Sequence, residues 1–285
     1  MWRCFGHKGR EMHKEQEVEP LSGEDLRKMV GSWDVVGDIA IVVIPEKLVM
    51  QERLIGEAIL RSNRKLKVVA RRKSTYGGEF RTTSLKILAG EHRTETETRE
   101  FGVRLRLDIE KVYYSVRSSS ERYRIASLVE KSEEILIPFS GVGPCPLVIS
   151  RSASPDSVTG IEKNPVAHEY ALQNLELNKN LRQSVRFCCG DVQEVLSQLT
   201  GSFDRIIMPL PTAGGQFLVD LLPRLKTGGW LHYYSMEKKG DFAHALQTVS
   251  KVVQALGRNI LESSLHKTGH CAPHTYRICV DAKID

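Results

Sequence analysis

The segment Ile135-Leu-Ile-Pro-Phe-Ser-Gly-Val-Gly-Pro144 places a short apolar strand directly before a loop that contains two glycines. Consecutive apolar residues are typical of a strand that is buried on both faces of a sheet. The glycines allow the backbone after that strand to pass close to a ligand. A lone Gly-x-Gly also occurs in an ordinary turn between a strand and a helix, so the strands that follow decide the fold.

Those strands alternate with helices down to the C-terminus. Asn164 and Pro165 are expected to open one of the helices, the first as its N-cap and the second at its first position. This alternation predicts a parallel sheet with helices on both faces, and ligands bind such sheets at the carboxyl ends of the strands. The predicted strands after the first cover residues 157–161, 185–188, 204–208, 230–234 and 276–280.

The N-terminal part has a different pattern of apolar and charged residues. Residues 1–31 are polar and mixed in charge, and we expect a flexible arm there. Residues 32–116 predict a small α+β domain, with one helix over 46–63 and several antiparallel strands, because apolar and charged residues alternate over 103–110. Residues 117–285 then form the α/β domain.

Composition excludes several classes of protein. The 285 residues carry a net charge of +6, which permits a polyanionic partner without requiring one. No apolar run approaches the ~18 residues of a membrane-spanning helix, and the first residues do not resemble a secretory leader, so we expect a cytoplasmic protein without a membrane. The six cysteines form no Cys-x-x-Cys pair. His266, His270 and His274 share a spacing of four, but Gly269 and Pro273 interrupt any helix there, and we expect no metal site.

Acidic residues follow the second and third strands of the α/β domain. Glu162 stands about 20 residues after the glycine loop, where a carboxylate accepts hydrogen bonds from ribose hydroxyls. Asp191 is placed to bind an adenine amino group, with Val192 packing on the ring. A nicotinamide enzyme would need a third glycine to seat a pyrophosphate, and Pro146 stands at that position. The three strand ends therefore favour S-adenosylmethionine as the cofactor.

Several further motifs stand in one order along the chain, and together they are specific. They are Trp33-Asp-Val-Val-Gly-Asp38, Gly78-Glu-Phe-Arg81, Leu88-Ala-Gly-Glu-His-Arg93, Asp108-Ile-Glu-Lys-Val-Tyr-Tyr-Ser115, Ser120-Glu-Arg-Tyr-Arg124, Phe139-Ser-Gly-Val-Gly-Pro144, Asn174-Leu-Glu-Leu-Asn-Lys179, Met208-Pro-Leu-Pro211 and His232-Tyr-Tyr234. Over residues 33–285 the chain resembles the archaeal and eukaryotic type of tRNA guanine-37 N1-methyltransferase. The resemblance implies a small α+β domain before a Rossmann-like class I methyltransferase domain, tRNA as partner, and a monomer. Many members carry a further N-terminal domain that binds the tRNA elbow, and we expect this chain to lack it.

The resemblance also implies residue roles. Glu121 aligns with the general base that takes the proton of guanine N1, and Arg81 with an arginine that holds the guanine. From the residues alone, Glu121 and Arg122 also fit a solvated helix start after Ser118. The expected substrate contacts are Tyr114, Arg117 and Arg122, and the expected cofactor contacts are Phe139, Gly141, Val142, Gly143, Glu162, Lys163, Asp191, Val192 and Pro209.

Two basic groups are candidates for phosphate contacts, although either also fits a solvated surface. They are residues 61–73, which include Arg61, Arg64, Lys65, Lys67, Arg71, Arg72 and Lys73, and the set Arg117, Arg122 and Arg124.

The sequence departs from the family pattern at two important positions. Ile137 replaces an aspartate that normally organises the glycine loop, and Pro209 replaces an asparagine placed beside the target base. Proline offers neither a side-chain donor nor a backbone N–H. Two alternatives therefore stay open: an aminocarboxypropyl transferase of the wybutosine pathway, and a tRNA-binding relative that has lost its chemistry. The retained Leu210-Pro211 and the segment around Glu121 look more like the methyltransferase than the aminocarboxypropyl transferase.

Overall fold

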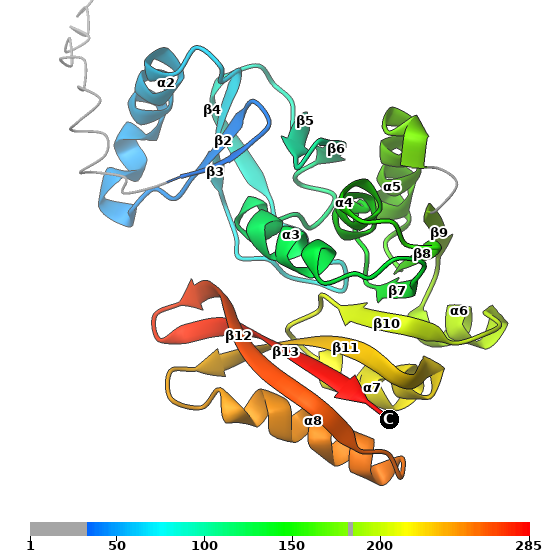
Figure 1. The fold of residues 1–285 in the computed structure, drawn as a ribbon. Coiled ribbons are helices and arrows are strands. Elements are labelled where there is room, and N and C mark those ends of the chain that lie inside the picture. Colours follow the sequence, from blue (N-terminus) through cyan, green and yellow to red (C-terminus); the bar gives the residue numbers. More distant parts are fainter. Residues whose placement is uncertain (1–32, 182–184) are drawn as a thin grey trace, which may run out of the picture.

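The computed structural model describes residues 33–181 and 185–285, so the expected N-terminal arm lies outside the described residues. The described chain begins with a four-stranded sheet in the order β1-β2-β3-β4 (Figure 1). The pairing of β2 with β3 is parallel, not antiparallel as expected, because the helical segment crosses over between these two strands. The elements are β1 (Asp34–Val36), β2 (Ile39–Val42), the 3-10 turn η1 (Glu46–Gln51), α2 (Glu52–Ser62), β3 (Val68–Arg72) and β4 (Leu85–Gly90).

The second sheet has seven strands in the order β12-β13-β11-β10-β7-β8-β9. Strands β7 to β11 pair in parallel, as predicted, but β13 runs antiparallel to both β11 and β12. The last two strands form a hairpin with a turn of two residues, and such a turn forces antiparallel pairing. The strands are β7 (Glu134–Pro138), β8 (Ser157–Glu162), β9 (Val185–Cys189), β10 (Phe203–Met208), β11 (Leu225–Lys238), β12 (Ile260–Ala272) and β13 (Thr275–Ile284).

Helices bury both faces of this sheet, as the apolar runs predicted. Ile135 and Ile137 of β7 point into one core, and Leu136 between them points into the other. The first core lies under α3 (Ser119–Ser127, preceded by η2, Val116–Ser118), α4 (Pro144–Ser152) and α5 (Pro165–Leu177, followed by η3, Lys179–Leu181). The second lies under α6 (Val192–Gln198), α7 (Leu218–Leu221, between η4, Gly214–Phe217, and η5, Leu222–Arg224) and α8 (Ala243–Ala255). Within the described residues, no helix is both long and apolar enough to cross a membrane.

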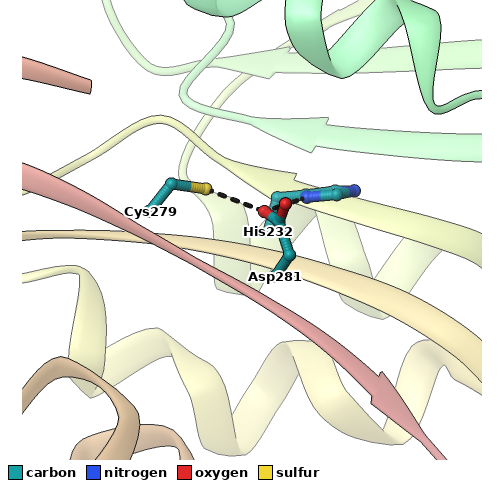
Figure 2. Close-up of side chains that lie close together, drawn as sticks. All are labelled: His232, Cys279 and Asp281. Carbon is teal, nitrogen blue, oxygen red and sulfur yellow. Dashed lines mark hydrogen bonds and ion pairs between the residues drawn. The ribbon is translucent and has the colours of Figure 1, made fainter. Parts of the chain in front are cut away.

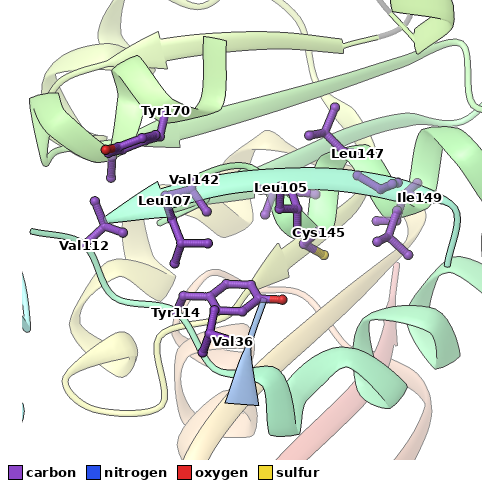
Figure 3. Close-up of a cluster of buried hydrophobic side chains, with 14 of the residues drawn as sticks. Val36, Leu105, Leu107, Val112, Tyr114, Val142, Cys145, Leu147, Ile149 and Tyr170 are labelled. Atoms are coloured by element: carbon purple, nitrogen blue, oxygen red, sulfur yellow. The ribbon is translucent and has the colours of Figure 1, made fainter. Parts of the chain in front are cut away.

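A two-stranded hairpin joins the two sheets. It consists of β5 (Glu95–Glu100) and β6 (Val103–Asp108), which pair antiparallel. Leu105 and Leu107 of β6 are fully buried and pack in one continuous core with Val36 of the small sheet and Leu147 of α4 (Figure 3). The small sheet therefore shares apolar packing with one face of the seven-stranded sheet.

Two asparagines, Asn174 of α5 and the C-cap residue Asn178, complete the free edge of β6. Asn174 accepts a hydrogen bond from the Arg106 backbone N–H (2.6 Å) and donates to the Arg106 and Val142 carbonyls (3.1 and 2.9 Å). Asn178, one helical turn later, pairs in the same way with the backbone of Arg104. The two side-chain amides thus take the place of a neighbouring strand, and this explains why asparagines stand four residues apart in the motif 174–179.

Asn174→Leu is expected to lower the free energy of unfolding by about 3 kcal/mol, because it leaves buried backbone groups of residues 106 and 142 without partners. Urea unfolding followed by circular dichroism measures this loss. Gln173→Leu is a matched control, since Gln173 is exposed on the same helix. Equal unfolding midpoints for the Asn174 variant and the unmodified protein would contradict the assigned role of the amide.

Candidate active site

Two adjoining pockets lie at the carboxyl ends of β7 to β10. We call them the Glu162 pocket, with a volume of about 430 Å³, and the Glu121 pocket, with a volume of about 100 Å³. Both are lined by Tyr113, Phe139, Gly141 and Pro209, so these residues form a shared wall. The location agrees with the rule that α/β sheets bind ligands where their parallel strands end.

The glycine loop between β7 and α4 forms part of this shared wall. Its backbone enters the left-handed region at Phe139, Gly141 and Gly143, with φ of 64°, 57° and 84°. Gly143 is the N-cap of α4, and a Cβ there would lie 2.6 Å from the Phe187 ring. The loop therefore needs a glycine at 143 for both its conformation and its close packing.

The Glu162 carboxylate holds this loop from β8. It accepts hydrogen bonds from the backbone N–H groups of Gly141 (2.7 Å) and Asn164 (2.8 Å). Burial raises the pKa of the Glu162 carboxyl, and the backbone hydrogen bonds partly oppose that change. A carboxylate has about four acceptor positions. Glu162 therefore retains acceptor capacity toward the pocket that it lines.

A charged bridge crosses the Glu162 pocket. The Lys163 ammonium lies 2.6 Å from a carboxylate oxygen of Glu79 and 3.0 Å from one of Asp191. The hydrogen bond from Lys163 lowers the pKa of the Asp191 carboxyl, which also caps α6 through the Gln193 N–H. These contacts connect the loop between β3 and β4 to the ends of β8 and β9.

Arg81 belongs to the same loop. Its guanidinium donates to the Thr212 hydroxyl at 2.8 Å and lies over the Tyr113 ring, 5.1 Å from its centroid. The structure therefore places Arg81 in the Glu162 pocket, on the other side of the shared Tyr113 from Glu121.

Glu121 stands in the first turn of α3 and points into the smaller pocket. Arg124 binds both of its carboxylate oxygens, at 2.7 and 2.8 Å, and the Tyr234 hydroxyl donates to one of them at 2.7 Å. Burial raises the pKa of the Tyr234 phenol well above its ordinary value, so Tyr234 remains a donor. Three hydrogen bonds fix the carboxylate and leave one acceptor position for a ligand.

Comparison with known proteins assigns the chain to a family. Residues 96–261 match the family model described as the TRM5/TYW2 methyltransferase domain, and residues 18–94 match the TYW2 N-terminal domain. The chain belongs to the TRM5/TYW2 methyltransferase family. The two family models meet between residues 94 and 96, nearer the N-terminus than the expected domain boundary at 116/117.

Individual members of the TRM5/TYW2 family are similar over most of the chain. The tRNA (guanine(37)-N(1))-methyltransferase Trm5b of Pyrococcus abyssi is 33% identical over 94% of this chain and 79% of its own length. The tRNA(Phe) (4-demethylwyosine(37)-C(7)) aminocarboxypropyltransferase of Methanocaldococcus jannaschii is 30% identical over 89% and 98%, respectively. A solved complex of aTrm5 with tRNALeu superposes with a TM-score of 0.78 at 32% identity, covering 92% of this chain and 75% of that one.

Most of the residues predicted from the family resemblance line one of the two pockets. The Glu162 pocket contains Arg81, Phe139, Gly141, Glu162, Lys163, Asp191, Val192 and Pro209, and the Glu121 pocket contains Tyr114, Glu121, Arg122, Phe139, Gly141 and Pro209. Val142, Gly143 and Arg117 line neither pocket. Val142 is buried behind the loop, and Arg117 forms an ion pair with Asp34 at 2.7 Å.

The interpretation of Arg122 and Arg124 as phosphate contacts is wrong. The Arg122 side chain is 11% exposed and is bound to both carboxylate oxygens of Glu100 (2.7 and 2.6 Å), which also accepts from the Tyr114 hydroxyl. Arg124 is held by Glu121 and Asp281. Glu121 does begin a helix, as the alternative interpretation had it, but its carboxylate is held inside the fold and not solvated. The substrate contacts of Tyr114 and Arg122 stay predictions.

The sequence did not indicate two side chains that complete the Glu121 pocket. Tyr234 was quoted only within a motif, and Arg277 of β13 was not singled out. Arg277 donates to the Thr268 hydroxyl and carbonyl at 3.1 and 3.2 Å and still lines the pocket. Arg277 stands on β13, which reaches the site through its antiparallel pairing with β11, whereas Tyr234 stands on β11, which pairs in parallel with β10.

Behind Glu121 lies a buried cluster of His232, Cys279 and Asp281, whose ligand atoms all lie within 4.8 Å of one another (Figure 2). His232 Nδ1 lies 2.7 Å from Asp281, and His232 Nε2 lies 2.6 Å from an Arg205 nitrogen. Because Arg205 can only donate, Nε2 accepts and Nδ1 carries the proton. Every imidazole nitrogen thus has a partner, so we assign the cluster to hydrogen bonding and not to metal binding. His266 and His270 lie on β12 and His274 in the turn after it.

His232 is expected to make the protein sensitive to mild acid. Burial, which is the largest cause, and the charges of Arg205 and Arg124 lower the pKa of His232 despite the opposing hydrogen bond to Asp281. The unfolded chain therefore binds a proton near pH 6.5 that the folded state does not bind. Below that pH the free energy of unfolding falls by up to about 1.4 kcal/mol per pH unit. Urea unfolding between pH 7.5 and 5 should show a smaller loss for His232→Gln than for the unmodified protein. Parallel pH slopes would contradict this expectation.

Proposed function

We propose that this protein transfers the methyl group of S-adenosylmethionine to N1 of guanine 37 in tRNA. The shared wall of the two pockets is the observation that carries the proposal. It brings a pocket suited to a nucleoside cofactor into contact with a smaller pocket that contains a fixed carboxylate. Methyl transfer needs this adjacency, since the acceptor nitrogen and the donated group must come within ~3–3.5 Å of each other.

The Glu162 pocket fits the cofactor. Glu162 offers a half-buried acceptor for two ribose hydroxyls, Asp191 an acceptor for an adenine amino group, and Val192 an apolar surface for the ring. The left-handed backbone at Gly141 lets the loop approach the ligand without a side chain in the way. When bound, S-adenosylmethionine supplies an electrophilic methyl group on a sulfonium centre.

The Glu121 pocket fits the flipped base. The remaining acceptor position of the Glu121 carboxylate would bind the guanine N1–H and take that proton as the N–C bond forms. Arg81 is kept as the residue whose guanidinium would stabilise negative charge on O6, although in this structure it lines the Glu162 pocket and not the Glu121 pocket. Pro209 lines both pockets and offers only apolar contact to the base.

The tRNA would bind across both parts of the chain. The anticodon loop must splay its base to reach the pocket, and single-stranded loops are the usual targets of specific RNA recognition. We propose that residues 32–116 form the tRNA-contacting part and residues 117–285 the methyltransferase domain, and that the protein works as a monomer in the cytoplasm without a metal. The similarity to a protein solved with tRNALeu supports the choice of partner.

Aminocarboxypropyl transfer is the second candidate. Two findings favour it: the match of residues 18–94 to the TYW2 N-terminal domain, and the 30% identity to an aminocarboxypropyltransferase over 98% of its length. A relative without catalysis is the third candidate, supported by the proline at position 209.

One experiment separates these candidates. Cofactor labelled either in the methyl or in the aminocarboxypropyl group is incubated with unmodified tRNA that carries guanine 37, with the same tRNA carrying adenine 37, and with tRNA carrying 4-demethylwyosine 37. Methyl label in the guanine substrate alone supports the proposal. Aminocarboxypropyl label in the demethylwyosine substrate supports the second candidate. Absence of label, together with absence of cofactor binding, supports the third.

A further inference from the structure

A chain of charged side chains connects Glu121 to the interior of the seven-stranded sheet. Arg124 of α3 binds Glu121 on one side and Asp281 of β13 on the other, the latter at 2.6 Å. Asp281 accepts from His232 of β11 at 2.7 Å, and His232 accepts from Arg205 of β10 at 2.6 Å. Glu133, directly before β7, binds the Arg205 guanidinium through both oxygens at 2.7 Å.

This series of charged side chains is held in place because its inner members are buried away from solvent. Arg205 is 1% exposed, His232 is fully buried and Asp281 is 4% exposed. Asp281 and His232 stand directly opposite each other in the register of β13 and β11. Cys279 and His266 also face the Asp281 carboxylate, at 3.1 and 3.2 Å. The backbone of the sheet thus fixes where the Asp281 carboxylate can lie.

Stability alone does not account for this arrangement. Buried ion pairs lose much of their Coulomb attraction to desolvation, and well-packed apolar side chains often replace them without loss. One end of this chain, however, reaches the Glu121 pocket. Arg124 uses Nε and Nη2 for Glu121 and Nη1 for Asp281, and Nη2 also lies 3.3 Å from Asp281, so its guanidinium plane is held from both sides.

We propose that Asp281, oriented by His232, is a positioning residue that acts through Arg124 to aim the Glu121 carboxylate. The inference rests on the proposed function, because it assumes that the aim of Glu121 matters for proton removal. Without the Asp281 charge, Arg124 keeps its bond to Glu121 but loses the contact that fixes its plane. Glu121 and Arg124 can then shift together, so the open acceptor position of Glu121 points less often toward the N1 proton.

The test is a double-mutant cycle between Asp281→Asn and Glu121→Gln, with single-turnover methyl transfer to guanine-37 tRNA as the readout. Asp281→Asn is expected to lower the methyl-transfer rate by about tenfold to 100-fold while the KM for tRNA and the Kd for the cofactor change less than about twofold. In the Glu121→Gln background, Asp281→Asn should lower the methyl-transfer rate almost no further, because the carboxylate that Asp281 positions is already absent.

Two variants of His232 and one control variant distinguish a positioning role from a loss of folding. His232→Phe removes the hydrogen bonds to Asp281 and Arg205 and should lower the methyl-transfer rate. His232→Gln can donate to Asp281 and accept from Arg205, so it should restore most of that rate. Glu237→Gln is the matched control, since Glu237 is a buried carboxylate of β11 that contacts His244 and lines neither pocket. It should leave the rate unchanged.

The outcomes separate this inference from the proposed function. Rate losses that multiply fully in the double variant would overturn the positioning role while methylation itself stands. If the unmodified protein transfers no methyl group, the proposed function fails, and the urea midpoints of the same four proteins still test the connection. Non-additive midpoint shifts would then support the coupling of Asp281 to Glu121, and additive shifts would overturn it.

Discussion

Glu121→Gln is expected to lower the rate of methyl transfer to guanine-37 tRNA by about 100-fold to 10,000-fold, the range of a lost general base. Glutamine keeps the shape of the side chain and can still accept from Tyr234 or Arg124, but its amide cannot take the N1 proton at neutral pH. Single-turnover kinetics with labelled cofactor measure the chemical step directly. Binding of tRNA, followed by filter retention, should be unchanged.

Glu130→Gln is the control for this prediction, because Glu130 is an exposed acid shortly after the same helix. Higher pH distinguishes the base from other roles: if Glu121 takes the proton, the variant should regain part of its rate as bulk hydroxide becomes available. An unchanged rate in Glu121→Gln at neutral pH would remove Glu121 as the base and would direct attention to the other polar side chains of the pocket.

The architecture could be predicted from the sequence where local patterning decides it. The apolar runs of β7 and β8 are buried on both faces, and Asn164 caps α5 as expected, accepting from the Val166 N–H at 3.0 Å. The antiparallel β13 was missed because the direction of a strand depends on the length of its connection, which apolar patterning does not contain. The parallel pair β2 and β3 follows from the helix over 46–63, a crossover connection that permits parallel pairing, so this error lay in the interpretation and not in the sequence pattern.

The site could be predicted only in part, for a different physical reason. Side chains at strand ends, such as Glu162 and Asp191, are placed by the topology of the sheet, so their positions follow once the strands are known. The partners of a charged side chain depend on contacts distant in sequence. Arg124 looked like a phosphate contact from its neighbours, but Asp281, 157 residues later, binds it inside the fold.

Ile137 illustrates a departure that the structure explains. The family pattern has an aspartate here that organises the glycine loop, whereas Ile137 is fully buried in the core. The Gly141 N–H is held by Glu162 of the neighbouring strand at 2.7 Å. The loop therefore has a carboxylate partner without an aspartate at 137, so this substitution alone does not indicate a lost cofactor site.

Glu162→Ala is expected to weaken S-adenosylmethionine binding by about 100-fold or more, because the cofactor loses two hydrogen bonds to a charged group, each of which contributes about 1.5–3 kcal/mol. The loop also loses the acceptor of the Gly141 N–H, which leaves the shared wall less ordered. Titration calorimetry of the unmodified protein should give a micromolar Kd, and tRNA binding should be the same in both proteins.

Glu169→Ala tests whether any loss of negative charge near the site has the same effect, since Glu169 is exposed on α5 and lines neither pocket. Its cofactor affinity should equal that of the unmodified protein. The size of the loss in Glu162→Ala also shows whether the cofactor site is intact or lost in a chain that carries Ile137 and Pro209. A large loss from a micromolar starting point means that the cofactor site is intact despite Ile137 and Pro209. No detectable heat with the unmodified protein would instead mean that the chain has kept the fold of the family without its cofactor.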